Sequence, residues 1–101
     1  SLYDLIAAEN LSEPDRGNIR ANGPDRWNRA RIIVSGGKVQ HWINNIKVVE
    51  YDRFSQSMKN LIKKSKYAKH QGFGLGSSGR ILLQDHSPGD VKFKNMKIRE
   101  F

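Results

Sequence analysis

The side chains best suited to chemistry lie on two predicted strands, at 38–43 and 80–86. Side chains alternate between the two faces of a strand, so Gln40 and Trp42 share one face of the first strand. By the same rule Gln84 and His86 share one face of the second strand, near its end. An indole ring can stack on the C–H face of a pyranose, and amide and imidazole groups can bond its hydroxyls. The four residues therefore predict a sugar-binding surface.

His86 is the candidate general base on that surface, because an unperturbed imidazole titrates at about pH 6.5. Plain structural roles compete with this interpretation. Trp27 and Trp42 could both serve as packing residues, and a strand-end histidine is commonly a hydrogen-bonded surface residue. Ordinary glycosidases use two carboxylates about 5–9.5 Å apart, and the spacing of the acidic residues supports no such pair. No metal ligand set is proposed either.

The elements that must position these side chains are mostly strands. Gly36-Gly37 and Asn44-Asn45 are typical turn pairs, and they join three β-rich stretches into an antiparallel meander. Residues 9–25 are dense in turn formers and predict a long loop. In all, strands are expected at 2–6, 26–34, 38–43, 46–51, 80–86 and 91–101.

One stretch departs from the strand pattern. Met58, Leu61 and Ile62 recur at helical spacing, with Ser55 or Ser57 available as a cap, which predicts one short helix near 55–66. The apolar phase changes between Phe93 and Met96, which predicts a β-bulge near Asn95. About six strands with one helix indicate an all-β fold of sandwich type.

Composition narrows the class further. A chain of 101 residues fits one domain, and the absence of cysteine excludes disulfides, a thiolate zinc site and a cysteine nucleophile. No apolar run approaches the roughly 18 residues of a transmembrane segment. The first residues, Ser1-Leu2-Tyr3-Asp4, lack the features of a signal peptide.

The formal net charge of +8 raises the question of an anionic partner. Lys59, Lys63, Lys64, Lys66 and Lys69 form one cluster, which would be the outer face of the predicted helix. No nucleic-acid-binding motif accompanies the charge, so a solvated face is favoured and no nucleic acid is expected. A polyanion-binding domain carried by Lys59, Lys63 and Lys64 remains a third hypothesis, behind the two given below.

Five segments resemble the 3-keto-disaccharide hydrolase domain family. They are SLYDLIA at 1–7, RWNRARIIVSGGKVQHWINN at 26–45, SKY at 65–67, GRILLQDH at 79–86 and VKFKNMKIREF at 91–101. The resemblance implies a concanavalin A-like, antiparallel jelly-roll β-sandwich and an origin in exported proteins of Bacteroidetes and related bacteria. It therefore implies a periplasmic or extracellular location. Asn45 replaces a common family glycine, and Leu82 replaces another, which could narrow an adjoining cleft.

The matching segments are similar to the second half of the family domain. We therefore expect 1–101 to be a single unit, the C-terminal half of a larger sandwich. A half sandwich leaves an edge and an apolar face uncovered. We therefore expect a missing N-terminal segment, a homo-oligomer or a rearranged, smaller sandwich.

The resemblance implies a glycoside hydrolase acting on 3-keto sugars or disaccharides, with carbohydrate as its partner. In that role His86 would be the base, Trp42 would stack on the sugar, and Gln84 and Gln40 would bind it. Gln84 or a bound divalent cation would hold an oxyanion; the cofactor is otherwise unknown. The alternative is a non-catalytic, lectin-like carbohydrate-binding module, because one sandwich supports either function.

Overall fold

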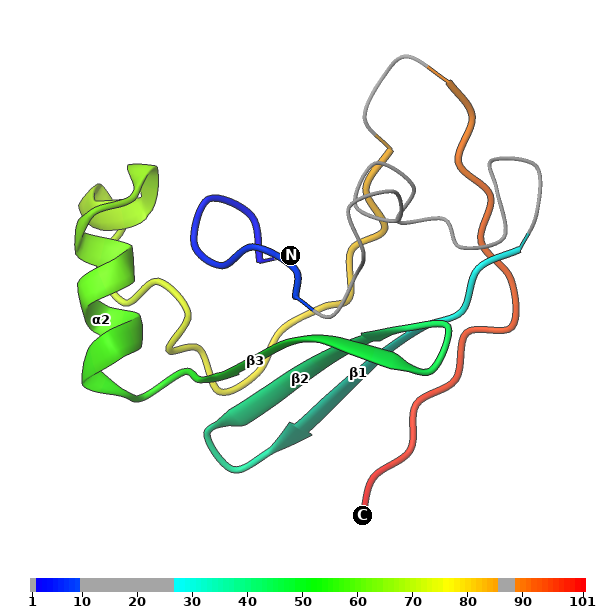
Figure 1. The fold of residues 1–101 in the computed structure, drawn as a ribbon, viewed down its shortest axis with the longest axis horizontal. Helices are drawn as coiled ribbons and strands as arrows, with labels where there is room; N and C mark the ends of the chain where they lie inside the picture. Colours follow the sequence, from blue (N-terminus) through cyan, green and yellow to red (C-terminus); the bar gives the residue numbers. More distant parts are fainter. Residues whose placement is uncertain (1, 10–26, 86–88) are drawn as a thin grey trace.

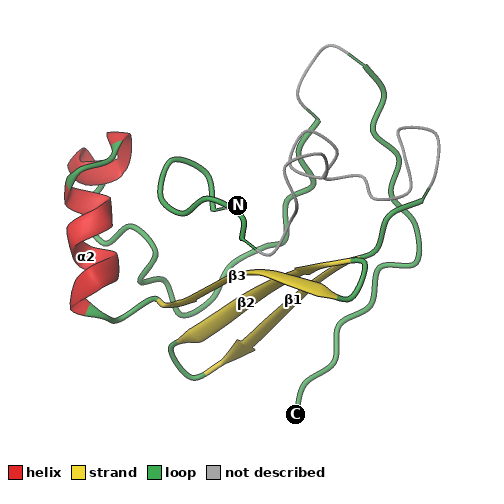
Figure 2. Ribbon diagram, viewed as in Figure 1, coloured by secondary structure: helices red, strands yellow, loops and turns green. Residues whose placement is uncertain are grey.

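The computed structural model describes residues 2–9, 27–85 and 89–101 (Figures 1 and 2). Its centre is a three-stranded antiparallel sheet in the order β1-β2-β3. A short helix and one turn of 3-10 helix follow the sheet, and the helix stands beyond one end of it (Figure 2). The elements are β1 (Ala30–Ser35), β2 (Lys38–Ile43), β3 (Ile46–Asp52), α2 (Gln56–Lys63) and η1 (Lys66–Lys69).

Both tight turns of the meander form where their sequence predicts them. Gly36 has a φ of 58°, and Asn44 and Asn45 have φ values of 47° and 69°. Asparagine tolerates this left-handed backbone better than most residues. The Asn44 side chain also ties its turn to the chain before β1, because its Oδ1 accepts a hydrogen bond from the Arg29 amide at 2.8 Å. The second hairpin is therefore held by tertiary contacts as well as by its own backbone.

The ladder between β2 and β3 contains a β-bulge. Trp42 pairs with Lys47, but His41 pairs with Val49, which leaves Val48 as the extra residue. Beyond the bulge, Gln40 pairs with Glu50 and Val39 with Tyr51. The neighbours Val48 and Val49 at the bulge are both buried, at 3% exposure each. A bulge bends its strand and redirects the side chains beside it.

Helix α2 begins and packs as its sequence indicates. Ser55 is the N-cap, and its hydroxyl oxygen accepts a hydrogen bond from the Met58 amide at 3.1 Å. Met58 is 4% exposed, and burial of a side chain of this size contributes about 1.5–3 kcal/mol. Among the described residues the buried hydrophobic core consists of Val39, Val48, Val49 and Met58.

Three strands that the sequence predicts are absent from the described residues. Residues 2–6 form a tight loop closed by an isolated bridge between Leu2 and Ile6. The described residues of 80–86, and the whole of 91–101, run without a strand assignment, so no bulge forms near Asn95. Asn95 does turn the backbone, with a φ of 54°. A strand needs a hydrogen-bonded neighbour, and these segments have none in the described part of the chain.

The architecture is therefore an antiparallel sheet with one short helix, consistent with part of a β-sandwich. The jelly-roll arrangement stays a prediction. The predicted loop at 9–25 falls almost entirely outside the described residues. No helix in the described residues is long and apolar enough to span a bilayer.

Candidate functional site

A chain of polar contacts crosses one face of the sheet, from β2 to β3. The indole Nε1 of Trp42 donates to Oε1 of Gln40 at 3.1 Å. The amide Nε2 of Gln40 donates in turn to Oε2 of Glu50 at 2.6 Å, and Lys47 Nζ donates to the same oxygen at 2.8 Å. The order of the contacts follows from the register, since Gln40 is opposite Glu50 and Trp42 is opposite Lys47. This chain of four residues is called the Trp42 relay below.

The relay holds Trp42 through its indole nitrogen. The face of the indole ring is therefore the part of Trp42 that could contact a ligand. Trp42 is half-buried. Its single N–H donor is already used by Gln40, so a sugar would contact the indole through its π face rather than through a hydrogen bond.

Glu50 is the charged anchor of the relay. Its hydrogen bond from Lys47, then that from Gln40, lower the pKa of the Glu50 carboxyl below its ordinary value. Both contacts favour the ionised form of the carboxylate. Glu50 is therefore an acceptor at neutral pH and is unsuited to act as a general acid there.

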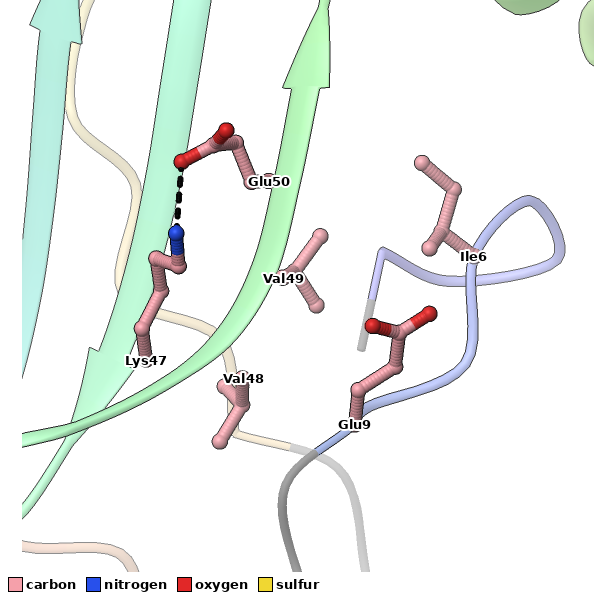
Figure 3. Close-up of a pocket in the computed structure, with 6 residues that line it drawn as sticks. All are labelled: Ile6, Glu9, Lys47, Val48, Val49 and Glu50. Carbon is pink, nitrogen blue, oxygen red and sulfur yellow. Dashed lines mark hydrogen bonds and ion pairs between the residues drawn. The ribbon is translucent and has the colours of Figure 1, made fainter.

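A hollow of about 280 Å³ opens beside β3, next to the anchor of the relay (Figure 3). Ile6 and Glu9 come to it from the N-terminal loop, and the other lining residues, Lys47, Val48, Val49 and Glu50, come from β3. The Glu9 amide donates to the Val48 carbonyl at 2.7 Å, which fixes the loop against the strand. The volume is slightly below the range of about 300–1,000 Å³ typical of small-molecule sites.

The structure brings together two of the four residues predicted for the sugar surface. Gln40 and Trp42 lie on one face, as expected, and are hydrogen-bonded. Gln84 is exposed on a segment without strand pairing. His86 lies outside the described residues, so its placement beside Trp42 remains a prediction. Trp27 is 51% exposed, with Lys94 Nζ 4.2 Å from the centroid of its ring.

Comparison with known proteins identifies the family. Residues 1–99 match the model of the 3-keto-alpha-glucoside-1,2-lyase-like domain. The chain belongs to this domain family. A protein of Bacteroides thetaiotaomicron named "3-keto-disaccharide hydrolase" is 30% identical over 109 residues, covering 98% of the chain. The chain spans about a third (34%) of the length of that curated relative.

Within this domain, Lys47 and Glu50 are the residues that the sequence pattern missed. Counted back from the Asn44-Asn45 turn, a regular hairpin would place Gln40 opposite Val49. The bulge at Val48 shifts the pairing by one residue and brings Glu50 opposite Gln40 instead. The adjacent pair Val48-Val49 is no specific signal for the bulge, since the apolar run Ile32-Ile33-Val34 of β1 pairs in regular register.

On the other face of the sheet, Val39 and Val49 of β2 and β3 are buried, and two aromatic rings lie in contact there. The rings of His41 and Tyr51 meet edge to face, with centroids 5.7 Å apart. Burial raises the pKa of the Tyr51 hydroxyl above its ordinary value of 10.0, and the Arg53 charge opposes that change. His41 is thus a packing residue, on the same face of β2 as the buried Val39.

No group of three or more His, Asp or Glu in the described ranges could hold a metal ion. The divalent cation considered from the sequence thus has no described ligand set, and it stays a prediction.

Proposed function

We propose that this chain forms part of the site of an enzyme that cleaves the glycosidic bond of 3-keto glycosides. The observation that carries the proposal is the family match over residues 1–99. The name of the Bacteroides thetaiotaomicron relative supports the same class of substrate. The Trp42 relay adds a physical basis, because it presents a half-buried aromatic ring in a fixed orientation beside polar groups.

The proposed reaction needs one base rather than two carboxylates. A ketone at C3 acidifies the proton on C2, and the base removes that proton to give an enolate. The electron pair of the enolate then forms the C1–C2 double bond as the C1–O bond breaks, and the departing oxygen takes a proton. Addition of water to the unsaturated sugar completes the hydrolysis.

The residues are assigned to these steps by type. His86 would take the C2 proton, and Gln84 or a bound cation would stabilise the enolate oxygen. Trp42 would stack on the sugar, while Gln40 would position the indole and could bind a hydroxyl with its remaining amide capacity.

We also propose that 1–101 is one part of a larger sandwich. Apolar side chains of the two unpaired segments stand in solvent, including Leu82 at 86% exposure and Ile98 at 77%. A further stretch of the same polypeptide would cover them, or else a second copy of the chain would. By the family resemblance the protein would work in the periplasm or outside the cell.

The proposal is tested by replacing His86 in the full-length protein and measuring cleavage of a 3-keto-glucoside. His86→Ala should lower kcat by about 10²–10⁴, the range for a general base. His70→Ala is the matched control, since His70 is an exposed histidine that directly follows η1, and it should leave kcat unchanged. Deuterium at C2 of the substrate should slow the normal enzyme if removal of that proton limits the rate.

Two outcomes would overturn parts of this scheme. Unchanged turnover by His86→Ala would remove His86 from the mechanism. Binding of unoxidised glycans on an array, with no cleavage of any 3-keto substrate, would show a lectin-like module instead.

A further inference from the structure

The positive charge of the chain is concentrated in one segment. Residues 53–84 contain seven Lys or Arg and no Asp or Glu, so this segment carries +7 of the formal net charge of +8. The rest of the chain, with eleven basic and ten acidic residues, is nearly neutral. The segment includes α2 and η1, which stand together at one end of the molecule (Figure 1).

Five lysines of this segment, on α2 and η1 and the residue that follows α2, are together called the lysine surface here. They are Lys59, Lys63, Lys64, Lys66 and Lys69, and all five are exposed. The ion pair that the structure shows within the described ranges joins Lys47 to Glu50, and none of the five lysines takes part in it. One carboxylate does lie nearby, since Asp4 Oδ2 accepts a hydrogen bond from the Lys66 amide at 3.1 Å. We propose that the lysine surface binds an acidic polysaccharide.

Helix stability does not account for the whole surface. Lysines near a helix C-terminus interact favourably with the helix dipole, which explains Lys63 and Lys64 at the end of α2. It does not explain Lys59, which lies in the first half of the helix. The helix dipole also does not explain why the lysines have no acidic partners on α2. A Glu or Asp four residues before a lysine would have stabilised the helix and reduced the repulsion between lysines.

The surroundings of the lysines favour a polysaccharide over a membrane. An interfacial helix must present its apolar side to lipid, whereas two of the three apolar residues of α2 face the protein, with Met58 buried and Ile62 half-buried, and the third, Leu61, is 37% exposed. No large aromatic residue lies on α2.

The aromatic rings beside the surface weigh against single-stranded nucleic acid. Such binding relies on free aromatic faces for the bases. The Tyr67 ring is stacked on Phe73, with centroids 4.2 Å apart and planes at 6°. Lys66 Nζ lies 5.3 Å from the Tyr67 centroid and 4.1 Å from that of Tyr3.

The choice of a glycan as the polyanion rests on the proposed function, since an enzyme of sugar metabolism can gain from holding the polymer that bears its substrate. Charge complementarity supplies the attraction, and it has a measurable consequence. With about four lysine contacts, and with the slope of about 0.7 per contact known for single-stranded nucleic acids applied to the glycan, affinity should fall about fiftyfold between 50 and 200 mM salt.

The experiment measures binding of the full-length protein to alginate, a polymer of uronic acids, with dextran as the neutral probe. The test variant is Lys59→Gln/Lys63→Gln/Lys64→Gln. The matched control is Lys92→Gln/Lys97→Gln/Arg99→Gln, which removes the same charge from the exposed C-terminal segment. Duplex DNA and anionic vesicles are the competing ligands, and thermal melting checks that each variant is folded.

We expect tight binding to alginate only, a steep salt dependence, and at least a tenfold loss in the test variant against less than threefold in the control. Equal losses in both variants, a flat salt response, or tighter binding to DNA or vesicles would overturn the proposal. Cleavage of a small neutral 3-keto-glucoside should be unchanged in the test variant. A failure of the lysine surface is therefore distinguishable from a failure of the proposed reaction.

Discussion

Removing the side-chain amide of Gln40 should release Trp42 and weaken substrate binding. In Gln40→Leu, the indole Nε1 of Trp42 loses its acceptor at 3.1 Å. A neutral intramolecular hydrogen bond of this kind contributes about 1 kcal/mol. Its loss should therefore lower the equilibrium ratio of held to released indole ring about fivefold. In the proposed function only the held ring stacks on the sugar, so KM should rise by two- to fivefold. The stacking contact is the same in ground and transition states, so kcat should change little.

The assay is the steady-state cleavage of a 3-keto-glucoside by the full-length protein. Glu50→Gln is the matched control, because it removes the charge but keeps an acceptor for the Gln40 amide, and its KM should stay within about twofold. Trp42→Phe sets the reference, since the phenyl ring has no N–H for Gln40 to accept. Adding Gln40→Leu to Trp42→Phe should therefore cost nothing further in KM, as expected for two residues acting through one contact.

Two results would refute this reasoning. An unchanged KM in Gln40→Leu would mean that Trp42 needs no support from Gln40 or does not contact the sugar. A fall in kcat with KM unchanged would mean that the Gln40 amide acts on the transition state instead of on Trp42.

Two further predictions concern stability. Asn45 has a φ of 69°, so Asn45→Gly should raise the free energy of unfolding by a few tenths of a kcal/mol, whereas Asn45→Ala should lower it by about 1 kcal/mol; thermal melting checks both, and a more stable alanine variant would contradict the assigned backbone. Burial raises the Tyr51 pKa, so the folded state holds that proton more tightly, and stability should decline as pH rises above about 10. Tyr51→Phe should flatten that decline in alkaline melts, and an unchanged slope would assign it to other groups.

The meander and the helix could be predicted from the sequence because local chemistry specifies them. Gly36 in the first turn and Asn44-Asn45 in the second supply the left-handed backbone that tight hairpins need. Ser55 supplies the N-cap, and Met58 supplies the buried contact of α2. Each of these signals acts within a few residues, so neighbouring sequence is sufficient to read it.

The polar contacts of the site were only half predictable. Alternation along β2 correctly placed Gln40 and Trp42 on one face, because that rule needs no partner strand. Their partners on β3 depend on register, and the bulge at Val48 changes the register by one residue. A count from the turn alone therefore gives the wrong neighbour for Gln40.

The segments at 80–86 and 91–101 show the limit of local reasoning most clearly. Their sequences are rich in apolar residues, yet Ile81 is 62% exposed, Phe93 is 49% exposed and neither segment is paired. A strand gains a defined face only when a neighbouring strand fixes its backbone, and the described part of the chain offers no such neighbour. The direction of the Gln84 side chain is therefore set by pairing that lies beyond its own sequence. The curated relative is about three times as long as its matched region. The proposal that 1–101 is one part of a larger sandwich therefore predicts that a strand from the rest of the protein covers these apolar side chains and orients Gln84.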